Sequence, residues 1–441
     1  MTPAPFTSAL TAPLFGDPEA AELLSDRAFI AQMLRVEAAL ARACAQVGLV
    51  SAGDADAIRA QLAELEITPA QLGPGMASAG VPVPALVTAL QEALGPESVA
   101  LHWGATSQDI VDCAHVLQWR ALLALLGARL GRVLDGLHTA SDAQADTLMA
   151  GRTRSQIATP ITLGLRLATW AQPLIALEGE LPGLRAQIGR AQLGGASGTG
   201  AAFGEKGAAL TDAFARELGL KPAPCWHLDR TGPQALGGWL VRLAAALAKL
   251  ARDLILAGRS EMGEMRAGQG GGSSTMPQKS NPVAAEAMVT LAQYAASLHP
   301  LLAGAAMPQE DRDGAAWALE WLALPQIGMA ASASLRHAEA LIDTLTPDPA
   351  RMASHLGAER GAVMAEAATL ALARHMPRAK AATMVKDALD VARASDRTLI
   401  EVLHQSAVLG ALENWTACLA PATAIAPAEA MRQRIWAARQ G

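Results

Sequence analysis

The stretch that decides the fold is PQALGGWLVRLAAALAKLARDLILAGRSEMGEM, residues 233–265. Its leucines recur every three or four residues, at positions 236, 240, 243, 247, 250 and 254, which is the spacing of one helix face. A helix over these 33 residues would be about 50 Å long. Because a helix with one apolar face must bury it against other helices, the sequence predicts an all-α bundle. The same spacing reaches Glu261 and Glu264, so we expect the face to end in acidic residues.

Other long helices are predicted on both sides of this stretch. Apolar residues step by three and four through Val116, Trp119, Leu123, Leu126, Leu130, Val133 and Leu137. A helix is expected to begin at Pro160, and another at Asn281-Pro282, where Asn caps the helix and Pro occupies its first turn. A further helix is expected over 314–345, kinked at Pro325.

The chain divides into three predicted domains. Residues 1–100 form an N-terminal helical domain with helices over 26–47 and 52–66, and 69–84, PAQLGPGMASAGVPVP, are expected to be extended or looped. Residues 101–346 form the central bundle, which carries the active-site segments. Residues 347–441 have shorter patterns and form a small C-terminal helical domain.

Composition excludes several classes of protein. Hydrophobic residues make up 51% of the chain, which argues against disorder, and the net charge of −6 gives no basic surface for nucleic acid. The four cysteines are widely spaced and form no zinc-binding pattern. No signal peptide is evident, and charged residues and glycines interrupt every apolar stretch before it reaches membrane length. We expect a soluble, cytoplasmic protein.

The most unusual connection is GQGGGSSTMPQKSNP, residues 268–282. Its glycines leave backbone N–H groups open to an anion, Ser273 and Ser274 add hydroxyls, and Lys279 adds a cation. With Asn281 at the start of the next helix, the loop has the groups to hold a carboxylate and to stabilise a dianion. It is not a nucleotide-binding loop of the Gly-Lys-Ser/Thr kind.

Three blocks resemble the fumarase/aspartase superfamily. The loop residues Gly272-Ser-Ser-Thr-Met-Pro-Gln-Lys-Ser-Asn281 are similar to its signature, His102–Asp109 to its first block, and Gly151–Pro160 to its second. The similarity covers about 20–330. It implies a three-domain, all-α fold in which the long helices form the core of a homotetramer, with active sites shared between subunits.

Within the superfamily, the blocks are most similar to the 3-carboxy-cis,cis-muconate cycloisomerases. Similar segments include Gln192–Thr199, Cys225–Arg230, and Gln309-Glu-Asp-Arg312 through Glu320-Trp321. The resemblance implies an intramolecular addition of a substrate carboxylate to a conjugated double bond in aromatic degradation. It proceeds through an aci-carboxylate intermediate and needs no metal or organic cofactor.

The resemblance also implies residue roles. Ser273 matches the loop serine that transfers the proton, and Lys279 matches a cation that holds the intermediate; both are expected to be catalytic. Substrate-binding roles are expected for His102, Thr106, Ser107, Thr153, Arg154, Gln156, Arg230, Ser274, Met276, Asn281 and Arg312. The partner is a small polycarboxylate.

Some positions depart from the family pattern. Arg154 stands where relatives carry His or Trp, and arginine stays protonated, so it cannot act as an acid or base. A guanidinium there can anchor an additional carboxylate, which favours a tricarboxylate substrate; alternatively, Arg154 pairs with a carboxylate such as Glu261. Gln278 and Ser280 replace the His and Arg common in cycloisomerases, and Gln278 resembles argininosuccinate lyase.

Three alternatives stay open at this point. The chain could be a fumarate-releasing lyase that acts on argininosuccinate or adenylosuccinate. It could also be a structural member of the fold without activity. Finally, Ala196-Ser197-Gly198 matches the triplet that aromatic ammonia lyases cyclise into a prosthetic group, although the signature loop belongs to the other branch.

Overall fold

The computed structural model describes residues 5–272 and 275–440. They form two compact units, each assembled from separated segments. Unit 1 comprises residues 1–130, 177–248 and 287–336, and unit 2 comprises 131–176, 249–286 and 337–441. Each of five long helices therefore contributes one part to each unit. These units do not follow the three segments expected from the sequence.

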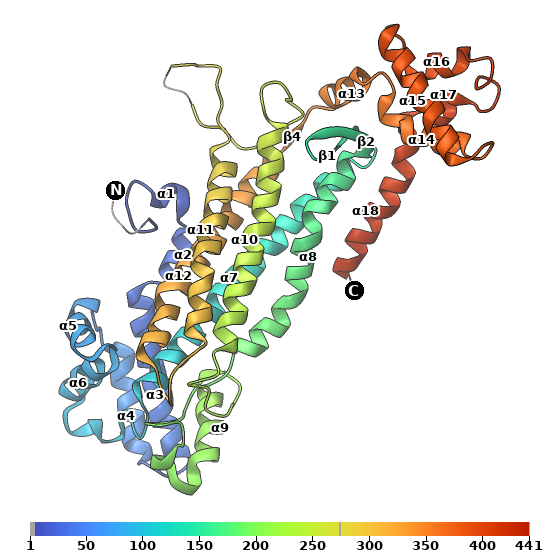
Figure 1. Ribbon diagram of the computed structural model, residues 1–441. Helices are drawn as coiled ribbons and strands as arrows, with labels where there is room; N and C mark the ends of the chain where they lie inside the picture. The colour runs from blue at the N-terminus through green and yellow to red at the C-terminus, as the bar shows by residue number, and fades with distance from the viewer. Residues whose placement is uncertain (1–4, 273–274, 441) are drawn as a thin grey trace. The chain divides into compact units, whose positions relative to one another are not determined.

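The five long helices are drawn in Figure 1. They are α7 (Ser107–Ala143), α8 (Leu163–Ile188), α10 (Thr231–Ala257), α11 (Val283–Ala305) and α12 (Gly314–Asp343). Unit 1 adds shorter helices: α1 (Ala12–Phe15), α2 (Pro18–Leu23), α3 (Asp26–Gln46), α4 (Ala52–Glu64), α5 (Pro69–Ala79), α6 (Val83–Leu94), η1 (Gly95–Ala100), η2 (Ala201–Lys206) and α9 (Gly207–Leu218).

Unit 2 combines the remaining helices with two small sheets. The helices are α13 (Pro349–Ala358), η3 (Ala362–Met364), α14 (Ala365–Leu372), α15 (Arg378–Ala394), α16 (Leu399–Gln405), α17 (Trp415–Cys418), η4 (Pro421–Ala424) and α18 (Ile425–Gln440). Strands β1 (Leu148–Thr153) and β2 (Gln156–Thr162) pair antiparallel, as do the short strands β3 (Met265–Arg266) and β4 (Thr346–Pro347).

The apolar face predicted on α10 is buried. Leu236, Leu240, Leu243 and Leu247 have no exposed side-chain surface in unit 1. Gly237 permits a close approach of α10 to α11, since a Cβ at this position would lie 2.2 Å from the side chain of Leu302 in α11. Trp239 Nε1 donates to the carbonyl of Leu177 in α8 at 3.0 Å. The bundle in unit 1 therefore rests on the periodic leucines, as the sequence indicated.

Unit 2 has a core of its own. Trp415 is fully buried among residues of α13 to α17, and Ala150 of β1 belongs to the same apolar cluster. The parts of the long helices in this unit also contact one another: Trp170 Nε1 of α8 donates to Asp253 of α10 at 2.7 Å. Because Ala150 of β1 packs in the cluster around Trp415, this cluster supports the hairpin formed by β1 and β2.

Helix α7 is the one described helix long and apolar enough to cross a membrane. Two-thirds of its most apolar window is buried inside the protein, which is typical of a core helix in a soluble protein. Its length and hydropathy are explained by the packing of Val116, Leu123 and Leu126, whose side chains are completely buried.

Three expectations about local structure are wrong. Residues 69–79 form α5 instead of a loop, because Thr68 and Gln71 make a capping box and Pro69 occupies the first turn. Helix α10 ends at Ala257, so Glu261 and Glu264 lie beyond it. Helix α8 begins at Leu163, because residues 156–162 instead pair with β1.

Candidate functional site

Predicted site residues from the first block gather at the start of α7 in unit 1. Ser107 is the first residue of α7, and Asp109 lies fully buried in its first turn. Asp109 Oδ2 accepts from the backbone N–H groups of Thr106 at 3.0 Å and Gly195 at 2.9 Å. Its Oδ1 accepts from the N–H of Gly194 at 2.8 Å. Asp109 thereby holds the loop that contains Gly194 and Gly195 against the N-terminus of α7.

Arg312 lies in the connection before α12 and joins the same loops. Its Nη1 donates to Thr106 Oγ1 at 2.8 Å, and its Nε donates to Gln108 Oε1 at 3.1 Å. Nη2 donates to the carbonyl of Ala196 at 3.0 Å. The structure therefore brings together Thr106 and Arg312, two residues that the sequence placed in the site. A half-buried guanidinium fixed in this way can bind a substrate carboxylate.

His227 supports this arrangement from the segment before α10. Its Nε2 donates to Asp109 Oδ1 at 2.9 Å, and its side chain is almost fully buried. Burial opposes the charged form, but the hydrogen bond to Asp109, together with the nearby Cys225, raises the pKa of His227 to about 9. His227 is therefore an imidazolium at neutral pH, and it balances the charge of Asp109.

Arg230 lies in a buried network of ion pairs. Its guanidinium donates to Asp112 at 2.8 and 3.1 Å and to Glu320 at 2.8 and 2.5 Å. Trp317 Nε1 also donates to Asp112, at 3.0 Å. Only 3% of Arg230 is exposed. Burial would raise the pKa of Asp112, but Arg230 lowers it below its usual range, while burial raises the pKa of Glu320.

His102 is half-buried and contacts a residue that sequence reasoning missed. Its Nδ1 lies 2.7 Å from Oε1 of Glu37 in α3. Burial would lower the pKa of His102, yet the hydrogen bond and charge of Glu37, with a contribution from Asp109, raise it. The sequence carries no sign that Glu37 is buried, because its burial depends on tertiary packing.

The second block forms a hairpin in unit 2. Thr153 of β1 pairs with Gln156 of β2, so Arg154 and Ser155 make the two-residue turn. Their φ angles are +50° and +67°, in the left-handed region that turns of this kind require and usually supply with Asn or Gly. The side chains of residues 153–156 are exposed. The turn therefore presents Thr153, Arg154 and Gln156 at its tip.

A buried ion pair anchors this hairpin. Arg152 donates to Glu264 with both Nη atoms, at 2.9 and 2.7 Å, and His355 Nδ1 lies 2.7 Å from Glu264 Oε1. Only 1% of Glu264 is exposed. Glu261 pairs with Arg259 at 3.3 Å. The sequence suggested that acidic residues end the apolar face of α10, but it gave no sign that Glu264 binds Arg152.

The signature loop is described in part. Gly271 and Asn281 pair through two backbone hydrogen bonds, of 2.8 and 2.9 Å, which close the base of the loop. The side chains of Met276 and Lys279 are exposed, and the N–H of Lys279 donates to the carbonyl of Met276. Ser273 and Ser274 lie outside the described residues. The predicted loop, hairpin and Asn281 all belong to unit 2.

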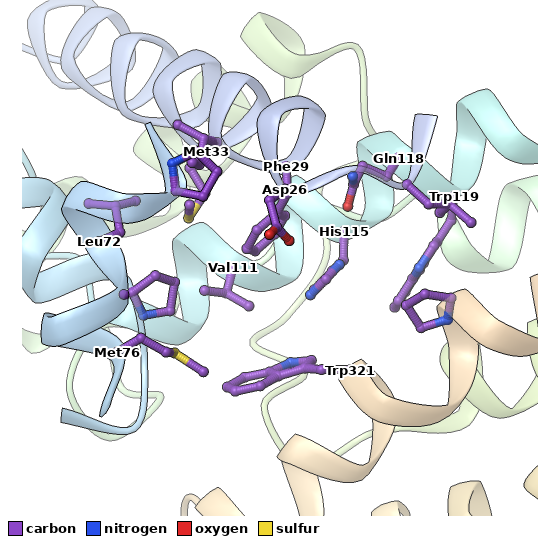
Figure 2. Close-up of a pocket in the computed structure, with 16 residues that line it drawn as sticks. Asp26, Phe29, Met33, Leu72, Met76, Val111, His115, Gln118, Trp119 and Trp321 are labelled. Carbon is purple, nitrogen blue, oxygen red and sulfur yellow. The ribbon is translucent and has the colours of Figure 1, made fainter. Parts of the chain in front are cut away.

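An apolar cavity in unit 1 is separate from these residues. Figure 2 shows His115 and Trp321 facing this cavity of about 320 Å³, whose lining includes none of the predicted site residues. His115 stacks between Phe29 and Trp119. Burial lowers its pKa to about 4, so it is neutral at pH 7. The described residues also contain no cluster of three or more His, Cys, Asp or Glu side chains able to hold a metal ion.

Comparison with known proteins gives consistent matches. A family model described as Lyase matches residues 17–295. The 3-carboxy-cis,cis-muconate cycloisomerase of Pseudomonas aeruginosa is 40% identical, over 88% of this chain and 86% of its own length. The enzyme of that name from Pseudomonas putida is 38% identical, over 90% and 94%. The crystal structure of the 3-carboxy-cis,cis-muconate lactonizing enzyme from Pseudomonas putida has a TM-score of 0.91 and 34% identity, over 98% of this chain and 99% of that one.

Proposed function

This chain belongs to the fumarase/aspartase superfamily of lyases, and we propose that it is a cycloisomerase that interconverts 3-carboxy-cis,cis-muconate and its carboxymuconolactone. The single observation that carries the substrate assignment is the match to the cycloisomerase of Pseudomonas aeruginosa, 40% identical over 88% of this chain. The fixed guanidinium of Arg312 beside Thr106 supports it, because a polycarboxylate needs such a donor.

The enzyme must stabilise the negative charge that develops on the substrate as the intermediate forms. A carboxylate oxygen of the substrate adds to a conjugated carbon–carbon double bond, and electron density moves onto the adjacent carbon and its carboxylate. The resulting aci-carboxylate takes a proton at that carbon to give the lactone. Fixed donors favour this intermediate over the ground state, since they are already oriented when the charge develops.

We assign the two groups of residues different parts of this chemistry. In unit 1, Arg312, Thr106, Ser107 and His102 bind substrate carboxylates. Substrate-binding roles are also assigned to Thr153, Arg154 and Gln156 of the hairpin and to Ser274, Met276 and Asn281 of the signature loop. Ser273 transfers the proton, and Lys279 holds the charge of the intermediate.

Arg230 has an indirect role in this proposal. Its donors are directed to Asp112 and Glu320, and the guanidinium is almost completely buried, so it is poorly placed to contact a substrate. We propose that it positions the start of α7, which carries both Asp112 and Ser107. This differs from the substrate-binding role that the family resemblance implied.

Arg154 is the residue that distinguishes this substrate from a dicarboxylate. The turn holds it in a left-handed conformation that costs about 1–2 kcal/mol for a residue other than glycine. An exposed arginine under that strain is typical of a functional position. Because Glu261 pairs with Arg259, it does not supply the partner considered for Arg154.

The active protein in this proposal is a soluble, cytoplasmic homotetramer. The long helices form its core, and each active site combines blocks from different subunits. Its partner is a small polycarboxylate, and no nucleic acid, membrane or cofactor takes part. It acts in aromatic degradation, where such carboxymuconates arise.

The experiment that tests the function is a parallel absorbance assay. The purified protein is given 3-carboxy-cis,cis-muconate, argininosuccinate and adenylosuccinate separately, and loss of the conjugated diene or appearance of fumarate is followed. We expect turnover of the carboxymuconate alone. Release of fumarate from argininosuccinate or adenylosuccinate would favour the C–N lyase alternative. Gln278 is the residue whose resemblance to argininosuccinate lyase keeps that alternative open.

A further inference from the structure

Glu37 is a buried acid with little to compensate its charge. Its side chain in α3 has no exposed surface. Oε1 lies 2.7 Å from His102 Nδ1, whereas Oε2 has no hydrogen-bond partner among the described residues. Ionised carboxylates buried in this way are costly unless an opposite charge is adjacent. The contact with His102 is therefore the one side-chain hydrogen bond that Glu37 makes among the described residues.

The two ring nitrogens of His102 differ in their contacts: Nδ1 contacts Glu37, and Nε2 makes no hydrogen bond with a described residue. Its backbone φ of +53° lies in the left-handed region, and Nδ1 faces Glu37. In the described part of the chain, Nε2 makes no hydrogen bond, and 20% of the side chain is exposed. His102 lies four residues before Thr106, which Arg312 contacts. Glu37 therefore fixes one ring nitrogen of His102, and the ring is partly exposed close in sequence to Thr106.

A second histidine–glutamate pair shows what is particular to Glu37. His355 and Glu264 have the same 2.7 Å separation and nearly the same exposure, 20% and 1%. Glu264, however, also binds Arg152 through two hydrogen bonds, which already balance its charge. No arginine or lysine among the described residues bonds to Glu37. Among the described residues, His102 is the one basic side chain that bonds to Glu37.

We propose that Glu37 is a positioning residue that keeps His102 protonated, so that His102 Nε2–H binds the substrate carboxylate whose negative charge grows in the intermediate. The inference rests on the proposed function and adds to it a buried acid outside the three family blocks. A charge-assisted hydrogen bond of this kind strengthens as the aci-carboxylate forms, so it stabilises the transition state more than the bound substrate.

The surroundings of the pair set the direction of its pH dependence. The ionisable groups that face His102 are Glu37 from α3 and Asp109 from α7, and both favour the imidazolium. Burial and the nearby Glu37 raise the pKa of Cys44 to about 12, so its thiol adds no charge. The pKa of His102 is raised, so its imidazolium persists to higher pH than that of an ordinary histidine and is lost as pH rises through the raised pKa. Activity should decline over that alkaline range.

The test uses two variants and one control. Glu37→Gln keeps the shape of the acid and removes its charge. His102→Asn removes the imidazole, and Asn tolerates the left-handed backbone. His375→Asn is the matched control, since His375 also contacts a glutamate, Glu413 at 3.0 Å, on the exposed surface of unit 2.

The first measurement is kcat and KM for 3-carboxy-cis,cis-muconate across pH. We expect the alkaline limb of kcat to move to lower pH by about one unit or more in Glu37→Gln, because an adjacent opposite charge shifts a pKa by that much. His102→Asn should lower kcat roughly a hundredfold and remove the limb. His375→Asn should match the wild type. The proposal would be overturned if the alkaline limb of kcat stayed at the same pH in Glu37→Gln, or if this variant lost the same fraction of kcat at every pH.

The second measurement does not need turnover. Diethyl pyrocarbonate modifies neutral imidazole, so its rate at His102, followed by peptide mass spectrometry across pH, reports the protonation of that residue. The midpoint should lie above about 6.5 in the wild type and fall in Glu37→Gln. Equal midpoints would refute the role of Glu37 whatever the substrate. A wild-type protein that does not convert carboxymuconate, but shows the midpoint shift, would refute the proposed function alone.

Discussion

Arg312 Nη1 donates to Thr106 Oγ1 at 2.8 Å, although the two residues are 206 positions apart in the chain. The contact joins the connection before α12 to the residue that precedes α7. Arg312 also donates from Nε to Gln108 Oε1 and from Nη2 to the carbonyl oxygens of Gly195 and Ala196. Arg312 therefore fixes two loops and still lies half-buried, where a carboxylate can reach it.

Arg312→Lys should lower kcat/KM for carboxymuconate. A lysine keeps the charge but cannot direct three donors to separate acceptors. The loss of charged hydrogen bonds is worth about 1.5–3 kcal/mol, or roughly ten- to 150-fold in kcat/KM. Steady-state kinetics measures it, with Arg360→Lys as control, because Arg360 forms an exposed pair with Asp396. Normal kcat/KM in Arg312→Lys would exclude Arg312 from substrate binding.

Arg154→Gly should separate backbone strain from substrate binding. Glycine adopts positive φ freely, so the midpoint of thermal unfolding should be unchanged or higher. Without the guanidinium, KM for carboxymuconate should rise roughly ten- to a thousandfold, from a lost contact of about 1.5–4 kcal/mol.

The neighbouring turn residue provides the control for that variant. Ser155→Gly relaxes a φ of +67° without removing a cation, and its KM should match the wild type. For cis,cis-muconate, which lacks the third carboxylate, the rise caused by Arg154→Gly should be smaller. Equal rises for both substrates would show that Arg154 does not anchor the third carboxylate.

The pair of His227 and Asp109 should make stability depend on alkaline pH. The pKa of His227 is about 9 in the folded protein and about 6.5 in an unfolded chain. Its stabilising contribution is therefore complete below about pH 6.5 and is lost as pH rises through 9. His227→Gln retains a donor without the charge. Between pH 7 and 10 the thermal midpoint should fall more steeply in the wild type; parallel curves would contradict the pairing.

Mixing two inactive variants should restore part of the activity. Ser273 and Thr106 belong to blocks that the proposal draws from different subunits of one tetramer. Ser273→Ala and Thr106→Ala proteins, dissociated and reassembled together, should form some sites in which both residues are intact. Activity is assayed against each variant reassembled alone. No recovery, with sedimentation showing a monomer, would refute shared sites.

The sequence predicted the parts of this protein that depend on local periodicity. The leucines of α10 and the apolar residues of α7 repeat at helical spacing, and both faces are buried as expected. The family blocks stand out in the sequence, because Thr106, Thr153 and Asn281 lie in long, specific motifs; the roles of these residues stay predictions. Within unit 1 the structure brings Thr106 and Arg312 together, and within unit 2 it pairs Thr153 with Gln156.

The buried charge pairs could not be predicted, because they join residues far apart in the chain. Glu37 with His102, Arg152 with Glu264, and Asp109 with His227 each bridge between 65 and 118 positions. No spacing rule connects such residues. The hairpin was missed for another reason: Arg154 and Ser155 form a turn that normally carries Asn or Gly, so its sequence gives no turn signal.

The most direct test of the account is to convert 3-carboxy-cis,cis-muconate in deuterium oxide and identify the product by NMR and mass spectrometry. Intramolecular addition followed by protonation predicts a lactone isomeric with the substrate, with one deuterium on the carbon next to the new ring bond and no fumarate. A substrate that stays unchanged, or a product formed by release of a group, would contradict the assignment of this chain as a cycloisomerase.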